Sequence, residues 1–302
     1  MHKNIEEIEF TIFDTETTGL EPESGDRIVE IAGIRFKGKE TIATFQSLVN
    51  PHRLISAGAF EVNKITQDML CGAPETKEIM PKFLGFIHSS CLCSYNATFD
   101  LEFLNNELKL MGRNLPSNKP VRQWFGFQNS QSHKPEGSGL ASFCQSHNTV
   151  VDILKMARRI LPALERYSLW FVADRLGIKT KQEHRAFSDV ELTLNVFNKL
   201  KEMLQAKGIL DFTNFLSLFG LNSQFLDDIN NQKLAKIQEA MDLGVRLKIK
   251  YLSGSDASVT ERDVIPKEIR QDKFKNYLVG YCCLRNEERT FRIDGILHIE
   301  VV

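Results

Sequence analysis

The sequence of 302 residues lacks any pair of cysteines at the Cys-x-x-Cys spacing that marks zinc and redox sites. Its six cysteines are scattered, and the adjacent Cys282 and Cys283 would point to opposite faces of a strand. We therefore expect all six to be reduced thiols, most of them packed as small hydrophobic side chains.

Long hydrophobic runs and an excess of charge are also missing. No stretch approaches the ~18 apolar residues of a membrane span, and residues 1–7 lack a signal-peptide core. We therefore expect a cytoplasmic protein with no membrane partner. The net charge of −1 excludes a protein that is basic all over. A nucleic-acid enzyme is still compatible with it, because a local basic rim and bound cations neutralise phosphates.

The length predicts two domains, because single hydrophobic cores tend to stop growing near ~250 residues. With 42% hydrophobic and 25% charged residues, the composition is that of an ordinary globular protein.

Two acids follow an apolar run near the start of the chain. Residues 8–13 are predicted to form a buried strand, and Asp14 and Glu16 come directly after it. Side chains two residues apart project from the same side of a strand. Two close carboxylates repel each other unless a proton or a cation lies between them, and oxygen ligands of this kind suit Mg²⁺ or Mn²⁺. Taken alone, an Asp-x-Glu pair is more often part of a solvated surface than a metal site.

Two further motifs follow in order. The segment Tyr95-Asn96-Ala97-Thr98-Phe99-Asp100 comes first, and His184-Arg185-Ala186-Phe187-Ser188-Asp189 comes later. With the first acidic pair, this ordered set resembles the DEDDh 3′→5′ exonucleases. The resemblance implies an α/β, RNase H-like fold, a mixed sheet with flanking helices. Predicted strands at residues 27–36 and 41–49 fit the opening of that fold.

The resemblance also implies a mechanism. Asp14, Glu16, Asp100 and Asp189 would hold two Mg²⁺ or Mn²⁺ ions, with Asp14 bridging both. His184 would be the general base, since histidine titrates near neutrality. The expected substrates are the 3′ ends of single-stranded DNA or RNA, with DNA favoured by the form of the first motif.

The resemblance also suggests which residues contact the substrate strand. By resemblance, the candidates that would contact it are Thr17, Thr18, Gly19, Leu20, Asn63, Ile65, Asn96 and Phe99. Asn63 stands where the family usually has His, and Lys64 stands where it usually has Gly. Ordinary core packing explains Ile65, Leu20 and Phe99 equally well.

Residues 112–150 are longer than the family's usual connection. This polar insertion contains Trp124-Phe125-Gly126-Phe127, and the next helix is predicted to open at Val151-Asp152-Ile153-Leu154. Loops of this length are usually functional or disordered. The aromatic side chains would stack on bases, dock a polymerase or regulatory partner, or hold the loop to its own domain.

The C-terminal part changes to a strand-like period of two. Strands are predicted at 247–251, 259–265, 277–284 and 290–302, after a helix that ends at Gly244. This part resembles the WYL domain, a small SH3/Sm-like β-barrel that binds nucleic acid or small anionic ligands. Asn276 replaces the Trp that names the family, and Gly295 replaces a usual Arg. The candidate ligand residues are Arg262, Tyr277, Arg285, Arg289 and Arg292.

The sequence therefore predicts an exonuclease domain at 1–205, a connector at 206–230 and a WYL-like barrel at 231–302. The expected activity is metal-dependent 3′→5′ hydrolysis of nucleic-acid ends. A non-catalytic regulatory protein that uses the nuclease fold only to bind nucleic acid remains the alternative.

Overall fold

The computed structural model describes residues 3–114, 149–179, 183–221, 224–272 and 275–302. The chain separates into two compact units. The larger unit comprises Glu6–Leu154 and Ser168–Asn198, and the C-terminal unit comprises Met1–Ile5, Lys155–Tyr167 and Lys199–Val302. None of the helices in these described ranges has the length and apolar character needed to cross a membrane.

The larger unit contains a mixed five-stranded sheet in the order β3-β2-β1-β4-β5. Its strands are β1 Glu9–Thr17, β2 Ile28–Lys37, β3 Glu40–Leu48, β4 Cys91–Ser94 and β5 Val150–Asp152. The first three strands are antiparallel, whereas β4 runs parallel to β1 and β5 parallel to β4. This topology confirms the predicted RNase H-like α/β class.

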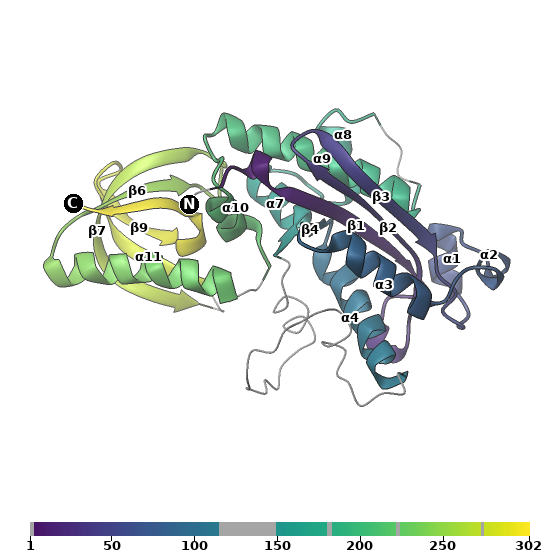
Figure 1. Ribbon diagram of the computed structural model, residues 1–302. Coiled ribbons are helices and arrows are strands. Elements are labelled where there is room, and N and C mark those ends of the chain that lie inside the picture. The colour runs from purple at the N-terminus through teal and green to yellow at the C-terminus, as the bar shows by residue number, and fades with distance from the viewer. Residues whose placement is uncertain (1–2, 115–148, 180–182, 222–223, 273–274) are drawn as a thin grey trace. The chain divides into compact units, whose positions relative to one another are not determined.

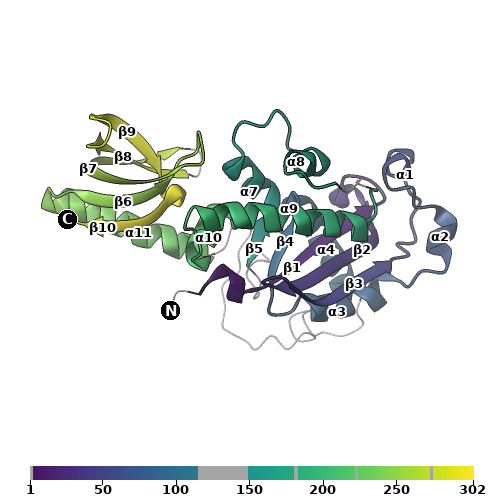
Figure 2. The same ribbon diagram turned by 90° about the horizontal axis from the view of Figure 1, so that it is seen from above.

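Helices cover both faces of this sheet, and the alternation of side chains along β1 decides which residue meets which helix. The Phe10 ring lies 5.2 Å from Phe197 of α9 (Ala186–Ala206). The Phe13 ring lies 5.9 Å from Phe83 of α3 (Thr76–Ile87), on the opposite face. Figure 2 shows α9 and α3 on either side of β1 and β2. The even-numbered residues of β1 therefore face α9.

The remaining helices of the larger unit are short, apart from α4. They are α1 Ala57–Asn63, α2 Gln67–Cys71, α4 Ala97–Asn114 and α8 Leu169–Arg175. Helix α7, Ile153–Ile160, has residues in both units, as α9 does. Two 3₁₀ turns, η1 Ile5–Glu7 and η2 Pro22–Ser24, flank β1. Helix α4 lies beside α3 on the same face of the sheet (Figure 1).

The C-terminal unit pairs two helices with an antiparallel five-stranded sheet in the order β10-β6-β7-β8-β9. Its elements are α10 Phe212–Phe219, α11 Gln224–Leu243, β6 Leu247–Leu252, β7 Val259–Asp272, β8 Lys275–Cys282, β9 Glu287–Arg292, η3 Ile293–Gly295 and β10 Ile296–Val301. Ile237 and Ala240 of α11 pack against Leu247, Ile249 and Phe291 of the sheet in one buried core. Figure 1 shows α11 lying along this sheet.

Four predicted elements differ from the structure. Strand β1 continues through Thr17, because its ladder with β2 extends past both acids. Residues 150–152 form a strand beside β4 before α7 begins. Strand β7 extends seven residues beyond the predicted end at 265, since it stays paired with β8.

The predicted strand 290–302 is two strands, β9 and β10, separated by η3. A Cβ atom at Gly295 would lie 2.8 Å from Cε2 of Tyr251, so the turn packs too closely for a side chain. The insertion lies outside the described residues from 115 to 148, and its first residues, 112–114, continue α4. The described cysteines are all free thiols.

Candidate active site

Three carboxylates from two distant parts of the sequence meet on one face of the sheet. Asp14 and Glu16 project from β1 toward α9, and Asp189 lies in the first turn of that helix. One oxygen from each of the three lies within 4.8 Å of the others. The structure thus brings three of the four predicted acids together.

The fourth predicted acid, Asp100, approaches the same strand from the first turn of α4. Its Oδ1 accepts hydrogen bonds from the backbone N–H of Thr15 (3.0 Å) and from Thr15 Oγ1 (2.7 Å). Its Oδ2 accepts one from Ser94 Oγ at the end of β4 (2.5 Å). Asp100 is buried, and these donors fix its carboxylate beside the acidic pair of β1.

Crowding and burial raise the pKa values of Asp14, Glu16 and Asp100. Burial, with the charges of Asp100, Glu16 and Asp189, raises the pKa of Asp14 well above its usual range. Burial first, and then the charge of Asp189, raises the pKa of Glu16 to about 8. Burial raises the pKa of Asp100 to about 6, although its hydrogen bonds favour the ionised form.

This donor set fits a divalent cation. Carboxylate oxygens are the ligands that Mg²⁺ and Mn²⁺ prefer, and a bound cation removes the repulsion that otherwise keeps protons on these acids. Asp14, Glu16 and Asp189 are the residues that would hold it, with Asp100 close enough to add to the negative field.

A fifth acid, Glu30, was not predicted. It is the register partner of Glu16 across β1 and β2, and it is buried with an exposed fraction of 1%. Its oxygens accept hydrogen bonds from Nε and Nη2 of Arg185 (2.9 and 2.8 Å) and from the backbone N–H of Ala186 (3.1 Å). Burial disfavours its charge, but the hydrogen bonds from Arg185 and Ala186 hold the pKa of Glu30 below its usual value.

Glu30 thereby attaches the start of α9 to the sheet. His184 lies two residues before this helix, exposed, with a positive φ of 52°. Asp189, one turn into α9, is the residue that the helix brings to the cluster. The only sequence signal for this attachment was an arginine inside the third motif, and its partner lies far away in the sequence.

Asn63 contacts the acidic cluster from the end of α1. It is buried, its Nδ2 donates to the carbonyl of Thr17 (3.3 Å), and its Oδ1 accepts from the N–H of Ile65 (3.1 Å). Asn63 also hydrogen-bonds the Glu16 carboxylate, and this bond offsets part of the rise in the pKa of Glu16 that burial causes. Ile65 itself is fully buried.

The residues after Glu16 form a turn that closes on Asp26. The hydroxyl of Thr17 donates to the carbonyl of Gly19 (2.6 Å). Thr18 is buried, its N–H donates to the carbonyl of Arg27 (2.9 Å), and its hydroxyl donates to Asp26 Oδ1 (2.9 Å).

Gly19 occupies this turn because the Asp26 side chain approaches its backbone closely. A Cβ atom there would lie 2.3 Å from Asp26 Oδ2, so a side chain has no room. Leu20 follows with an exposed fraction of 79%, free to touch a ligand.

The two remaining substrate candidates flank the start of α4. Asn96 has a positive φ of 67°, its N–H donates to Asp152 Oδ1 (3.2 Å), and its side chain is exposed. Phe99 is half-buried, with its ring 5.0 Å from that of Phe103.

The candidate ligand residues of the C-terminal unit are only partly brought together. Tyr277 and Arg292 are register partners on β8 and β9, and Arg292 is bound to Asp294. Arg262 is buried, with its guanidinium 5.7 Å from the centre of the Phe291 ring. The other two are exposed: Arg289 pairs with Glu287, and Arg285 lies just after β8.

Comparison with known proteins agrees with this architecture. The family model described as Exonuclease matches residues 11–197, and the model of the WYL domain matches residues 232–301. A crystal structure of a full-length 3′-exonuclease superposes with a TM-score of 0.50 at 17% identity, covering 69% of this chain and 64% of that chain. The likeness shows a shared fold.

Curated relatives point the same way. A DNA polymerase III subunit epsilon of Treponema pallidum is 36% identical over 197 residues, which cover 65% of this chain and 77% of that protein. A DNA polymerase III PolC-type of Caldanaerobacter subterraneus is 28% identical over 285 residues, which cover 92% of this chain. This chain spans only 18% of the length of that polymerase. The match over residues 11–197 and the epsilon relative show that the chain belongs to the exonuclease family, and its residues 232–301 are a WYL domain.

Proposed function

We propose that the protein is a divalent-metal-dependent 3′→5′ exonuclease that removes nucleotides from single-stranded nucleic-acid ends, with DNA favoured over RNA. One observation carries the proposal. Oxygens of Asp14, Glu16 and Asp189 lie within 4.8 Å of one another, and with Asp100 they form a negative cluster that favours a cation.

Each side chain of the cluster has a role in this reaction. Asp14, Glu16, Asp100 and Asp189 would hold two Mg²⁺ or Mn²⁺ ions, and these ions would supply charge neutralisation at the phosphate and a more acidic water. His184 takes a proton from the attacking water. A bond forms between that water and phosphorus as the bond from phosphorus to the 3′ oxygen breaks. The products are a nucleoside 5′-monophosphate and a shortened strand with a free 3′ hydroxyl.

The relatives support the choice of polarity and substrate. The epsilon relative from Treponema pallidum is named as a DNA polymerase III subunit, and a solved relative is named as a 3′-exonuclease. The turn of Thr17, Thr18, Gly19 and Leu20 and the exposed Asn96 border the acidic cluster in sequence. We propose that they touch the terminal nucleotides, together with Asn63 and Phe99. Ile65 is fully buried in a core with Val29 and Leu70, so core packing is its role. A polymerase is a possible partner class on the same ground.

The WYL domain is proposed to bind nucleic acid or an anionic ligand near Tyr277 and Arg292. These two residues are cross-strand neighbours, and a guanidinium pairs with phosphate in a fixed fork. Arg262 contributes less on this view, because it is buried against an aromatic ring. Arg289 and Arg292 each already pair with a carboxylate, which an anionic ligand would have to displace.

The test is digestion of labelled oligonucleotides with Mn²⁺ or Mg²⁺. DNA and RNA strands, each unblocked, 3′-blocked or 5′-blocked, are compared for wild type and Asp14→Ala. The proposal predicts stepwise shortening that a 3′ block stops and a 5′ block does not, and that Asp14→Ala loses. Tight binding without shortened products would instead support the non-catalytic alternative.

A further inference from the structure

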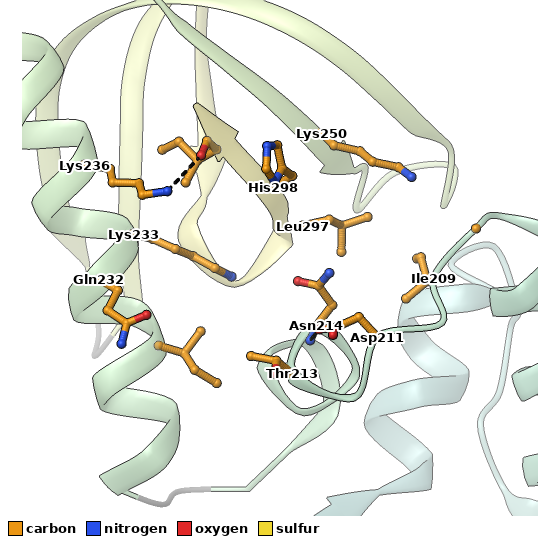
Figure 3. Close-up of a pocket in the computed structure, with 13 residues that line it drawn as sticks. Ile209, Asp211, Thr213, Asn214, Gln232, Lys233, Lys236, Lys250, Leu297 and His298 are labelled. Carbon is orange, nitrogen blue, oxygen red and sulfur yellow. Dashed lines mark hydrogen bonds between the residues drawn. The ribbon is translucent and has the colours of Figure 1, made fainter. Parts of the chain in front are cut away.

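The C-terminal unit contains a cavity of about 540 Å³ between α10, α11, β6 and β10. Three lysines border it: Lys233 and Lys236 from α11, and Lys250 from β6. His298 of β10 and Asn214 of α10 complete its polar rim. Figure 3 shows Lys233 reaching from α11 toward Asn214 across this space. The cavity contains none of the arginines assigned above to the WYL ligand site.

Lys233 is the unusual member, because it is a cation placed almost entirely out of water. Its exposed fraction is 8%. Its Nζ donates to Ser217 Oγ (2.9 Å) and to the carbonyl of Ile293 (3.5 Å), both of which are neutral acceptors. Burial lowers the pKa of Lys233 to about 8. A buried ammonium without an anion is costly, so the position favours a negative ligand.

The charges around the cavity strengthen this conclusion. Lys236 donates only to the carbonyl of Ile299 (3.3 Å), and within the described part of the chain no carboxylate forms an ion pair with any of the three lysines. Asp211 is the one acid on the wall, and its Oδ1 caps α10 at the N–H of Asn214 (2.9 Å). Asp294, which attracts Lys233 from a distance, is bound by Arg292.

Size and lining indicate the kind of anion. Ligand pockets commonly measure about 300–1,000 Å³, with mainly apolar walls and a few convergent polar groups. Apolar side chains of Ile209, Ile229 and Leu297 form the wall beyond the lysines. A phosphate monoester carries about −1.5 to −2 charges and three acceptor oxygens, which suits the ammonium groups of Lys233 and Lys236 on α11. An inorganic ion would leave the apolar wall uncovered.

We propose that this cavity binds a phosphate monoester of about the size of a mononucleotide. Lys233 and Lys236 of α11 bind the phosphate, Lys250 adds positive charge from the other side of the cavity (Figure 3), and the apolar wall contacts the uncharged body of the ligand. The proposal does not depend on the hydrolysis proposed above, because all of its residues belong to the C-terminal unit.

Isothermal titration calorimetry of the full chain in EDTA tests the site. Without a cation, the cluster of Asp14 repels phosphate, so binding reports a site outside that cluster, and the lysine variants below assign it to this cavity. The probes are dAMP, AMP, ribose 5-phosphate, inorganic phosphate and adenosine. We expect the three monoesters to bind saturably, inorganic phosphate to bind at least about tenfold more weakly, and adenosine not to bind.

Matched variants locate the binding. Lys236→Gln should weaken the binding of dAMP about tenfold or more, because it removes a charge-assisted contact, and Lys250→Gln should weaken it less, because Lys250 lies on the other side of the cavity. Lys248→Gln is the control, since Lys248 is exposed on the same strand and lies outside the cavity. Lys233→Met keeps the length of the side chain without its charge, and a thermal melt verifies that it folds.

Three outcomes would overturn the proposal. One is the absence of saturable binding of any monoester at millimolar concentrations. Another is equal affinity for dAMP in wild type and in the Lys236 and Lys250 variants. The third is inorganic phosphate binding as tightly as dAMP, which would leave the apolar wall without a role.

Discussion

The buried Glu30 and the half-buried Arg185 form an ion pair through two hydrogen bonds of 2.9 and 2.8 Å, joining the central sheet to the residue just before α9. Glu30 faces Glu16 across two strands, and Arg185 directly follows His184. The pair therefore links the two halves of the candidate site. Arg185 touches none of the four predicted metal ligands in the contacts described above, so we regard it as a positioning residue.

Arg185→Leu should lower kcat by about 10- to 100-fold with little change in KM, as is typical when a partner behind a metal ligand is lost. The leucine leaves the Glu30 carboxylate buried without its cation and frees the start of α9. Arg185→Lys should restore part of the rate. Arg166→Leu, at an exposed arginine, is the control. A wild-type kcat in Arg185→Leu, with only a lower melting temperature, would reduce the pair to a structural role.

Asp14→Asn should abolish nuclease activity, by about three orders of magnitude or more, and yet stabilise the metal-free protein. The amide removes a charge that Asp100, Glu16 and Asp189 repel. We expect the melting temperature in EDTA at pH 8 to rise by about 3 to 6 °C. Asp68→Asn, at an exposed acid of α2, should change neither quantity. A lower melting temperature in Asp14→Asn would contradict the repulsion inferred here.

The metal-free protein should lose stability as the pH rises from 4.5 to 8. The folded pKa of Glu16 is about 8 against 4.5 for an ordinary glutamate, so the folded state holds a proton that the unfolded state has released. The contribution of Glu16 to the free energy of unfolding is fully present below pH 4.5. It is lost as the pH rises to about 8, a decrease of about 4 kcal/mol. Added Mn²⁺ should raise the melting temperature far more at pH 8 than at pH 5. An equal shift at both values would argue against a carboxylate site.

For Lys233 we expect the opposite dependence: its contribution to stability should grow as the pH rises, and it should do so at a higher pH. Its folded pKa is about 8 against 10.5 for an ordinary lysine, so its contribution to stability is absent below pH 8 and grows toward pH 10.5. Lys233→Met should be more stable than wild type at pH 7, by about 3 kcal/mol, and the difference should shrink by pH 10. Chemical denaturation at both pH values measures it. A difference that is independent of pH would show that Lys233 keeps its ordinary pKa.

The sequence predicted what is encoded locally. Asp14 and Glu16 share a strand, Asp189 lies one turn into a helix, and the ordered motifs indicated the larger unit's fold. The alternation of residues along β1 was sufficient to place both acids on one face. Helix α11 and strand β6 also followed from periodicity.

What the sequence did not predict depends on contacts between distant residues. The ion pair of Glu30 with Arg185 depends on the sheet register and on the position of α9, and a local sequence pattern predicts neither. The extension of β1 through Thr17 depends on pairing with β2. The turn at Gly295 depends on the neighbouring Tyr251 ring, and Lys233 resembles any other polar residue of an amphipathic helix until its burial is known.

The central claim is that Asp14, Glu16 and Asp189 hold a divalent cation. An anomalous difference map from a crystal soaked in Mn²⁺ tests it most directly. We predict a peak bounded by oxygens of these three carboxylates in wild type, and its loss in Asp14→Asn. A wild-type map with no peak among them, at a Mn²⁺ concentration that supports full nuclease activity, would contradict the account.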